Sequence, residues 1–374
     1  MSLHLDIAAR VGSFELNVTF VAARGVTALF GRSGAGKSSV VKVIAGLLRP
    51  TRGYIRIDDH VLFDSAAGID VPAHLRRIAC VFQDARLFPH LSVQSNLRYG
   101  WRHCPPELRA IEFDKVVELL GLEALLNRRP RDLSGGEQQR VAIGRALLSN
   151  PRALLMDEPL TSLDAQRKAE IMPYIERLRD EFGMTIVYVS HLTDEVIRLA
   201  DQVVMLRDGK VVDCGPTTEM LGRIDLYPVI GRKEGGVVFD SIVSHHNDED
   251  ALTTLAFADG ALRIPRVDLP IGAKLRVHIA ARDVAIALER PKQISVRNIL
   301  RGTIGQQVDI IGAFAELRID LGNVAIVARV SRAAVRELAL IPGREVFALI
   351  KSIAIDRESI GRIESARYLP RIVE

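Results

Sequence analysis

Short, mostly apolar runs alternate with longer helical patterns up to about residue 225. Four of these runs stop at a polar or glycine residue: Val26 to Phe30, Ala153 to Met156, Thr185 to Val189 and Gln202 to Leu206. Apolar runs of this length are typical of strands that are buried on both faces of a parallel sheet. The pattern therefore predicts an α/β layer built on a mostly parallel sheet.

Two features interrupt this layer. The dipeptide Asp208-Gly209 follows the last run and predicts a tight hairpin that returns through Lys210-Val211-Val212. Between about residues 90 and 150 the pattern becomes helical, with Val116 and Leu120 on one apolar face and Gly121 as a C-terminal cap. We interpret this stretch as a helical subdomain inserted into the α/β core.

After residue 231 the pattern changes to strands with one buried face. Leu275, Val277 and Ile279 alternate with charged or polar residues, and the stretch from Glu316 to Leu321 alternates in the same way. One helix is predicted from its cap at Ser331 through Leu340. These patterns predict a small all-β, OB-like barrel domain after the cassette.

Composition adds the number of domains and excludes some partners. A chain of 374 residues with 48% hydrophobic and 26% charged residues is long enough for two or three globular domains. We expect domains at residues 1–231 and 232–374. The net charge of +4 arises from interspersed charges of both signs, so nucleic acid is not expected as a partner. No apolar run reaches the roughly 18 residues of a spanning helix, so we expect membrane contact only through a partner.

The three cysteines, Cys80, Cys104 and Cys214, are an odd number and lie far apart. They show neither a disulfide framework nor zinc-ligand spacing, which fits a reducing cytoplasm.

A glycine-rich loop follows the first apolar run and precedes a helical pattern from Ser38 to Leu48. It matches GxxxxGK[ST], whose backbone N–H groups surround phosphate oxygens while its lysine reaches the β- and γ-phosphates and its hydroxyl binds Mg²⁺. The predicted ATP-binding residues here are Gly31, Arg32, Ser33, Gly34, Ala35, Gly36, Lys37, Ser38 and Ser39.

Two adjacent acids, Asp157 and Glu158, end the second apolar run. On its own, such a pair is common at solvated strand ends. Together with the glycine loop, we expect Asp157 to hold Mg²⁺ beside Ser38, and Glu158 to act as the general base for the attacking water.

The segment Leu133-Ser134-Gly135-Gly136-Glu137-Gln138-Gln139-Arg140 stands between these two motifs. With it, the chain resembles the nucleotide-binding subunits of ATP-binding cassette (ABC) transporters over residues 1 to about 225. Further marks of that family follow in order: Gln83 after Phe82, Asp164 after Ser162-Leu163, and His191 at the end of the third run.

This resemblance implies a head-to-tail homodimer that holds two nucleotides between its copies. In that family Ser134, Gly135 and Gly136 contact the nucleotide of the opposite copy, and Asp164 lies in a loop at the interface. Gln83 would sense Mg²⁺ and water, and His191 would contact the γ-phosphate. Taken alone, His191 is equally well a core histidine. The family's aromatic residue for adenine is missing near Ala9-Arg10, and we expect Phe14, the nearest aromatic, to belong to the core.

The C-terminal half carries a second resemblance. Residues 294–302 with Leu349-Ile350-Lys351-Ser352 resemble the molybdate-binding (molbindin-like, Mop) barrel module, expected at about 293–360, and the cassette resembles molybdate-importer ATPases. In such barrels hydroxyl, N–H and cationic donors hold a tetrahedral oxyanion. The candidate donors are Ser295, Arg297, Asn298, Lys351 and Ser352. The alternative is that they are polar residues at the ends of strands in a purely structural barrel.

Together these observations predict an ATPase that energises molybdate import from the cytoplasmic face of the inner membrane. Its expected partners are an integral membrane permease dimer, received at Asp84 to His90, and indirectly a periplasmic molybdate-binding protein. Bound molybdate would regulate import by feedback. The alternatives are transport of another anion such as tungstate or sulfate, transport of a sugar, or a soluble oxyanion-binding regulator.

Overall fold

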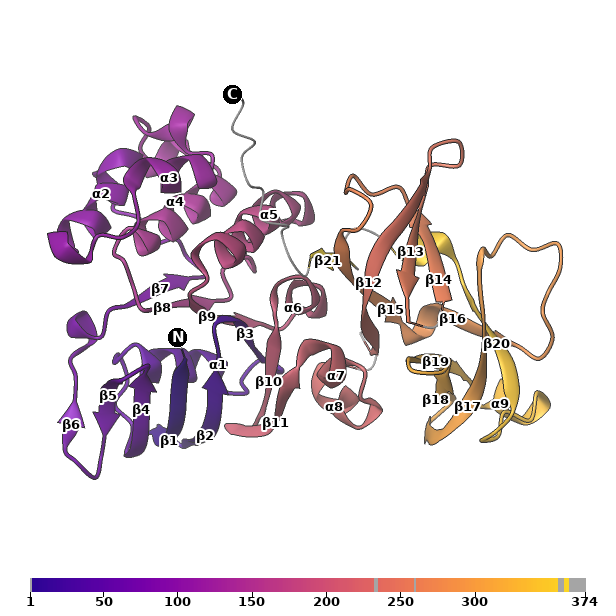
Figure 1. The fold of residues 1–374 in the computed structure, drawn as a ribbon. Helices are drawn as coiled ribbons and strands as arrows, with labels where there is room; N and C mark the ends of the chain where they lie inside the picture. The colour runs from indigo at the N-terminus through magenta and orange to yellow at the C-terminus, as the bar shows by residue number, and fades with distance from the viewer. Residues whose placement is uncertain (1, 232–234, 259, 356–359, 363–374) are drawn as a thin grey trace. The chain divides into compact units, whose positions relative to one another are not determined.

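The computed structural model describes residues 2–231, 235–258, 260–355 and 360–362 (Figure 1). The chain divides into two compact units. The first comprises Met1–Leu192 and Ala200–Gly215, and the second comprises Thr193–Leu199 and Pro216–Glu374. This division joins residues 216–231 to the second unit. The domain bounds 1–231 and 232–374 stay a prediction.

An 11-stranded sheet forms the centre of the first unit. Five strands lie side by side and parallel in the order β10-β3-β9-β8-β7, and four of them are the predicted apolar runs. Their bounds are β3 (Gly25–Phe30), β7 (Ile78–Phe82), β8 (Ala153–Asp157), β9 (Thr185–Ser190) and β10 (Gln202–Arg207). Parallel strands end at the same edge, so residues that follow β3, β7, β8 and β9 come together there.

The other half of this sheet is largely antiparallel, which the prediction of a mostly parallel sheet missed. Along β2 the residues Leu16, Val18 and Phe20 are buried and alternate with exposed neighbours, a pattern of period two. The turn at Asp208-Gly209 is confirmed, with φ of 49° and 75°. The strands are β1 (Leu3–Val11), β2 (Phe14–Ala22), β4 (Arg52–Ile57), β5 (His60–Asp64), β6 (Ile69–Asp70) and β11 (Lys210–Pro216).

Helix α1 (Lys37–Ile44) follows the glycine loop, and a buried arginine caps its C-terminal end. Arg76 is 2% exposed, and its Nη1 donates to the carbonyls of Val43 and Ile44 at 2.9 and 3.0 Å. Its Nε bonds the carbonyl of Val71, and its Nη2 pairs with Asp70 at 3.2 Å. The last carbonyls of a helix have no partner within it, so this cation fixes the end of α1 opposite the loop.

The structure has helices in the range of about residues 90–150, where the sequence predicts a helical insertion. Helices α2, α3 and α4 form a group in Figure 1, and α4 contacts β7. Val116 and Leu120 are buried, and Gly121 takes the left-handed conformation after α3. Within the described residues, no helix is both long and apolar enough to cross a membrane. The helices are α2 (Val93–His103), α3 (Phe113–Leu119), α4 (Gly135–Leu147) and α5 (Ala165–Phe182). Short 3-10 turns lie at Ala73–Leu75, Pro106–Leu108, Glu123–Leu125 and Pro130–Asp132.

Two five-stranded antiparallel sheets around one hydrophobic core form most of the second unit. Their orders are β14-β13-β12-β15-β21 and β16-β20-β17-β18-β19. Leu275, Val277 and Ile279 point into this core as their alternation predicted. The strands are β12 (Gly236–Asn247), β13 (Leu252–Phe257), β14 (Gly260–Pro265), β15 (Lys274–Ala280), β16 (Val284–Ala287), β17 (Asn298–Ile311), β18 (Phe314–Asp320), β19 (Ala325–Ser331), β20 (Glu345–Ile350) and β21 (Ile360–Arg362).

Short helices complete the second unit. Ser331 caps α9 as predicted, with its Oγ accepting from the N–H of Ala334 at 3.1 Å, but the helix ends earlier than expected, at Glu337. The helices are α6 (Thr193–Leu199), α7 (Thr217–Leu221), α8 (Tyr227–Ile230) and α9 (Arg332–Glu337). The 3-10 turns are Ile224–Leu226, Ala281–Asp283 and Ser352–Ala354.

The cap of α1 gives a prediction for stability. Arg76→Met removes the side-chain donor to the Ile44 carbonyl and a buried partner of Asp70, while the Val43 carbonyl keeps the N–H of Gly46 at 3.1 Å. We expect the free energy of unfolding of the first unit to fall by about 3 kcal/mol. Urea denaturation followed by the fluorescence of Trp101, the chain's one tryptophan, measures this unit. Arg49→Met is the control, because Arg49 pairs with the same Asp70 at 3.0 Å but is 77% exposed. Its loss should cost about 0–1 kcal/mol; equal effects of both variants would contradict the role of burial.

Candidate functional site

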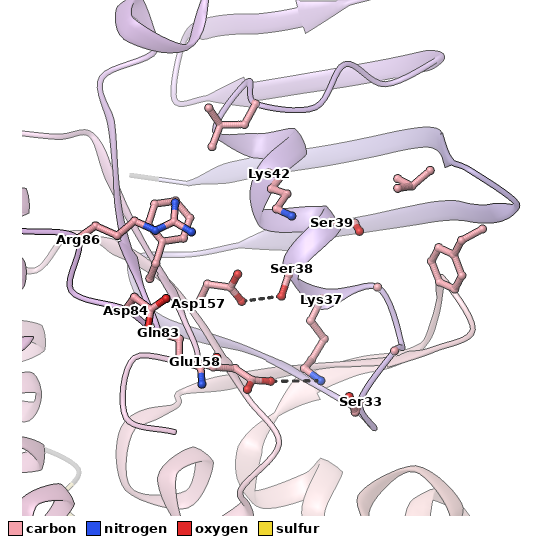
Figure 2. A pocket seen from close by; sticks show the side chains of 16 residues that line it. Ser33, Lys37, Ser38, Ser39, Lys42, Gln83, Asp84, Arg86, Asp157 and Glu158 are labelled. Atoms are coloured by element: carbon pink, nitrogen blue, oxygen red, sulfur yellow. Dashed lines mark hydrogen bonds and ion pairs between the residues drawn. The ribbon is translucent and has the colours of Figure 1, made fainter. Parts of the chain in front are cut away.

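A cavity of about 800 Å³ lies at the edge of the first unit's sheet, where the glycine loop follows β3 and the acidic pair ends β8. Figure 2 shows Lys37 and Ser38 facing Asp157 and Glu158. The residues that line the cavity are Val11, Phe14, Ser33, Gly34, Gly36, Lys37, Ser38, Ser39, Lys42, Leu47, Phe82, Gln83, Asp84, Arg86, Asp157 and Glu158. Most of the predicted nucleotide-site residues of the loop and of β8 therefore meet at one place.

The glycine loop is closed by its own lysine. Lys37 is 5% exposed, and its Nζ donates to the carbonyls of Gly31 and Arg32 at 2.7 and 3.1 Å. Burial lowers the pKa of Lys37, while the nearby carboxylates of Glu158 and Asp157 oppose that shift. A Cβ on Gly31 would lie 2.3 Å from the Leu206 carbonyl, so only glycine fits at the first position of this turn.

Ser38 and Asp157 are joined directly. The Ser38 hydroxyl donates to Asp157 Oδ1 at 2.9 Å. Burial raises the pKa of Asp157, the Ser38 hydrogen bond opposes this, and the charge of Glu158 adds to it. A hydroxyl and a carboxylate are oxygen donors of the kind that Mg²⁺ prefers, so these two side chains fit the predicted Mg²⁺ site.

Glu158 stands at the centre of the charged groups. Its Oε1 lies 3.9 Å from Lys37 Nζ and 3.3 Å from His191 Nδ1, and its Oε2 accepts a hydrogen bond from Thr161 at 3.3 Å. Its backbone has a φ of 50°, in the region that non-glycine residues rarely adopt, and its N–H donates to the Val189 carbonyl at 3.1 Å. Strained backbone of this kind clusters at functional sites. His191 thus lies beside the proposed base rather than in a core.

Gln83 lies on the cavity wall directly after β7. Its neighbours Asp84 and Arg86 also line the cavity, and Figure 2 shows all three on the other side of the two acids from α1. The Arg86 guanidinium lies 4.1 Å from the centroid of the Phe82 ring. From the sequence, Asp84 and Arg86 are predicted at the interface with the permease, and their place on the wall of the nucleotide cavity is a finding of the structure.

Two apolar residues of the first hairpin line the cavity as well. Phe14 was expected in the core, and it does pack against the core from a half-buried position, but it also lines the cavity with Val11. A Cβ on Gly36 would lie 3.0 Å from Phe14 Cε1, so the ring touches the glycine loop. The hairpin turn at Gly12-Ser13 was the sequence signal that could have indicated this position.

The second glycine motif lies outside the cavity lining. Ser134 caps α4, with its Oγ accepting from the N–H of Glu137 at 3.3 Å while the Glu137 carboxylate accepts from the N–H of Ser134 at 2.7 Å. Gly135 is exposed and Gly136 is buried. Asp164 caps α5, accepting from the N–H of Arg167 at 2.9 Å. These four residues do not complete the cavity of their own chain.

The oxyanion candidates gather at one end of a sheet in the second unit. Asn298 pairs in register with Ile350, so Lys351 and Ser352 follow beside it. The Asn298 side chain is 3% exposed and engaged with β14: its Oδ1 accepts from the N–H of Arg263 at 2.7 Å and its Nδ2 donates to the carbonyl of Arg263 at 3.0 Å. Asn298 therefore joins two strands.

The other four candidates differ in their surroundings. Ser295, Arg297 and Lys351 are exposed, and Arg297 Nη1 donates to the Ile294 carbonyl at 3.2 Å. The Ser352 hydroxyl is buried with no hydrogen-bond partner among the described residues. This arrangement is compatible with anion binding through these four donors.

Two family models and several curated relatives match this chain. A family model described as "ABC transporter" matches residues 16–161, and one described as "TOBE domain" matches residues 294–355. The molybdenum import ATP-binding protein ModC of Mesorhizobium japonicum is 51% identical, over 96% of this chain and 98% of its own length. The proteins of the same name from Paramagnetospirillum magneticum and Rhodospirillum rubrum are 48% and 47% identical, over 97% and 96% of this chain and 100% and 98% of their own.

These relatives cover nearly the whole chain, and the two family models include the loop of Lys37, the acids that end β8 and Asn298 at the start of β17. The chain therefore belongs to the family of molybdenum import ATP-binding proteins, the ABC transporter ATPases that carry a C-terminal TOBE domain.

Proposed function

We propose that this chain is the ATPase subunit of a molybdate importer, acting at the cytoplasmic face of the membrane with a separate permease dimer. The observation that carries the proposal is the meeting of Lys37, Ser38, Asp157 and Glu158 in one cavity of a chain whose relatives are molybdenum import ATP-binding proteins. The overall reaction would convert ATP, water and external molybdate into ADP, phosphate and internal molybdate.

In the proposed reaction the cavity residues position ATP and water. Lys37 would replace its hydrogen bonds to the loop carbonyls by hydrogen bonds to β- and γ-phosphate oxygens. Ser38 and Asp157 would hold Mg²⁺, which would neutralise developing charge on the phosphates. Glu158 would take a proton from the attacking water. The water oxygen would bond to the γ-phosphorus while the bond between the γ-phosphorus and the oxygen that stays on ADP breaks. His191, 3.3 Å from Glu158, would orient that carboxylate and contact the γ-phosphate.

A second copy would complete the site. Ser134, Gly135 and Gly136 begin α4 outside their own chain's cavity lining, and the start of a helix favours anions. We infer that they contact the nucleotide of the opposite copy in a head-to-tail homodimer, with Asp164 in the loop between the copies. Val11 and Phe14 would face the adenine, in place of the aromatic residue that the family usually has.

The second unit would sense the transported anion. Ser295, Arg297, Lys351 and Ser352 offer cationic and hydroxyl donors around the end of β17, which suits a tetrahedral dianion. Molybdate bound there would slow import when the internal supply is sufficient. Asn298 would support this site by holding β14 rather than by donating to the ligand.

Glu158→Gln tests the general base. We expect ATP affinity within about threefold of wild type and a kcat lowered by about 10²–10⁴-fold, because the amide cannot accept the proton. Nucleotide binding is measured by calorimetry and turnover by phosphate release. Glu170→Gln, an exposed acid on α5, should keep its rate. A rate near wild type in Glu158→Gln would remove Glu158 from this role.

Lys37→Ala tests the phosphate contact. Loss of a buried charged donor should weaken ATP binding at least about tenfold, measured with a fluorescent ATP analogue. Lys115→Ala serves as the control, since Lys115 lies on α3 over the Phe182 ring. Unchanged affinity in Lys37→Ala would refute the proposed contact.

Anion titration of the full chain tests the second unit. Molybdate should release heat on binding, and Arg297→Ala with Lys351→Ala should lower the affinity by about tenfold or more through loss of charge-assisted hydrogen bonds. Lys292→Ala removes a nearby exposed charge and should keep the wild-type affinity. Absence of any heat with molybdate, tungstate or sulfate would leave the barrel a structural domain.

A further inference from the structure

The segment from Phe82 to Ser92 carries Gln83, and side chains of two helices hold its backbone. From α4, the buried Gln139 donates through Nε2 to the carbonyl of Phe82 at 3.1 Å. From α2, the fully buried Asn96 accepts from the N–H of Phe88 at 2.9 Å and donates to the carbonyls of Phe88, Leu91 and Ser92. The segment is therefore attached at both ends to the helical insertion.

Arg145, also on α4, holds the middle of the segment. Its Nη2 donates to the carbonyls of Ala85 and Arg86 at 3.3 and 2.9 Å, and its guanidinium lies 5.1 Å from the centroid of the Phe88 ring. Burial lowers the pKa of Arg145, which is half-buried beneath this segment. Among the described residues, no other side chain donates a hydrogen bond to these two carbonyls.

The backbone is strained at Arg86, one of the two residues whose carbonyls Arg145 bonds. Arg86 has a φ of 45°, in the left-handed region that residues with a Cβ rarely adopt. Without a partner for its carbonyl, this turn could relax to an ordinary conformation and move Gln83, three residues earlier. The Arg145 hydrogen bonds therefore stabilise the strained turn that follows Gln83, which lines the cavity.

The helices that supply these contacts are packed closely against each other. A Cβ on Gly100 of α2 would lie 2.3 Å from the carbonyl oxygen of Arg145, so the two backbones are in direct contact. A Cβ on Gly144 would lie 2.8 Å from Leu97 Cδ2 and 3.1 Å from Leu120 Cδ1. Helices α2 and α4 are therefore closely packed, and both hold the segment that carries Gln83.

We propose that Arg145 is a positioning residue that fixes Gln83 to helix α4. The same helix begins at Ser134, in the turn that would contact the opposite copy's nucleotide. That turn and the segment that carries Gln83 would therefore move together. This inference rests on the proposed roles of Gln83 and Ser134, and it adds the side chain that links them within one copy.

A double-mutant cycle tests the link. In the wild-type background, Arg145→Met should lower kcat by about 10- to 100-fold, because small misplacement of a catalytic group has effects of this size. The KM for ATP should change less than about threefold, since Lys37 and Ser38 are untouched. In the Gln83→Ala background, Arg145→Met should lower kcat by less than about twofold, because the group that it positions is gone.

Arg140→Met is the matched control. Arg140 lies on the same helix, donates to the carbonyls of Leu120 and Gly121, and stacks 5.1 Å from the Tyr174 ring, but it does not touch the Gln83 segment. Its effect on kcat should be the same factor in both backgrounds. Amide hydrogen exchange over residues 83–88 should speed up in Arg145→Met and stay unchanged in Arg140→Met.

The possible failures are distinguishable. The positioning role is overturned if Arg145→Met lowers kcat by the same factor in the Gln83→Ala background as in the wild type. It is also overturned if amide exchange over residues 83–88 is unchanged in Arg145→Met. In both cases the proposed ATPase activity stands. If Gln83→Ala by itself keeps the wild-type kcat, the proposed role of Gln83 is overturned, and the role of Arg145 with it.

Discussion

The parallel strands β3, β8 and β9 end side by side at one edge of a sheet, and the chemistry of the first unit depends on that alignment. Hydrogen bonding in register brings together the loop after Phe30, the acids at the end of β8 and the histidine after Ser190, although the loop is more than a hundred residues from the other two in the sequence. The side chains on these loops then lie within hydrogen-bond distance of one another, as the Ser38 hydroxyl and Asp157 Oδ1 do at 2.9 Å. The precision of the cavity comes from the backbone ladder, which explains why the polar groups sit on turns next to an apolar core.

Much of this arrangement could be predicted from sequence because its signals are local. Apolar runs identified β3, β8, β9 and β10, and fixed spacing identified the residues from Gly31 to Ser38. The antiparallel strands before residue 70 were missed because only one of their faces is buried, as in β2, so no continuous apolar run marks them. Phe14 illustrates the same limit: one ring can pack against a core and border a cavity, and a pattern of hydrophobic residues cannot separate the two.

Contacts between distant parts of the chain could not be predicted from local sequence patterns, for a different reason. Arg76, Gln139 and Arg145 each act through backbone carbonyls, and a carbonyl carries no sequence signal. Asn298 was a candidate ligand on the strength of its polarity, yet its amide joins two strands through both its oxygen and its nitrogen. Polar residue types predict that a partner exists, while the fold decides which partner it is.

The lysine of the glycine loop has a consequence for the strength of phosphate binding. Because the Lys37 ammonium is buried and donates to two carbonyls of its own turn, a phosphate that binds it competes with those carbonyls rather than with bulk water. The net gain from that contact is then the difference between two sets of hydrogen bonds inside the protein. Such a difference favours release of the product as well as entry of the next nucleotide.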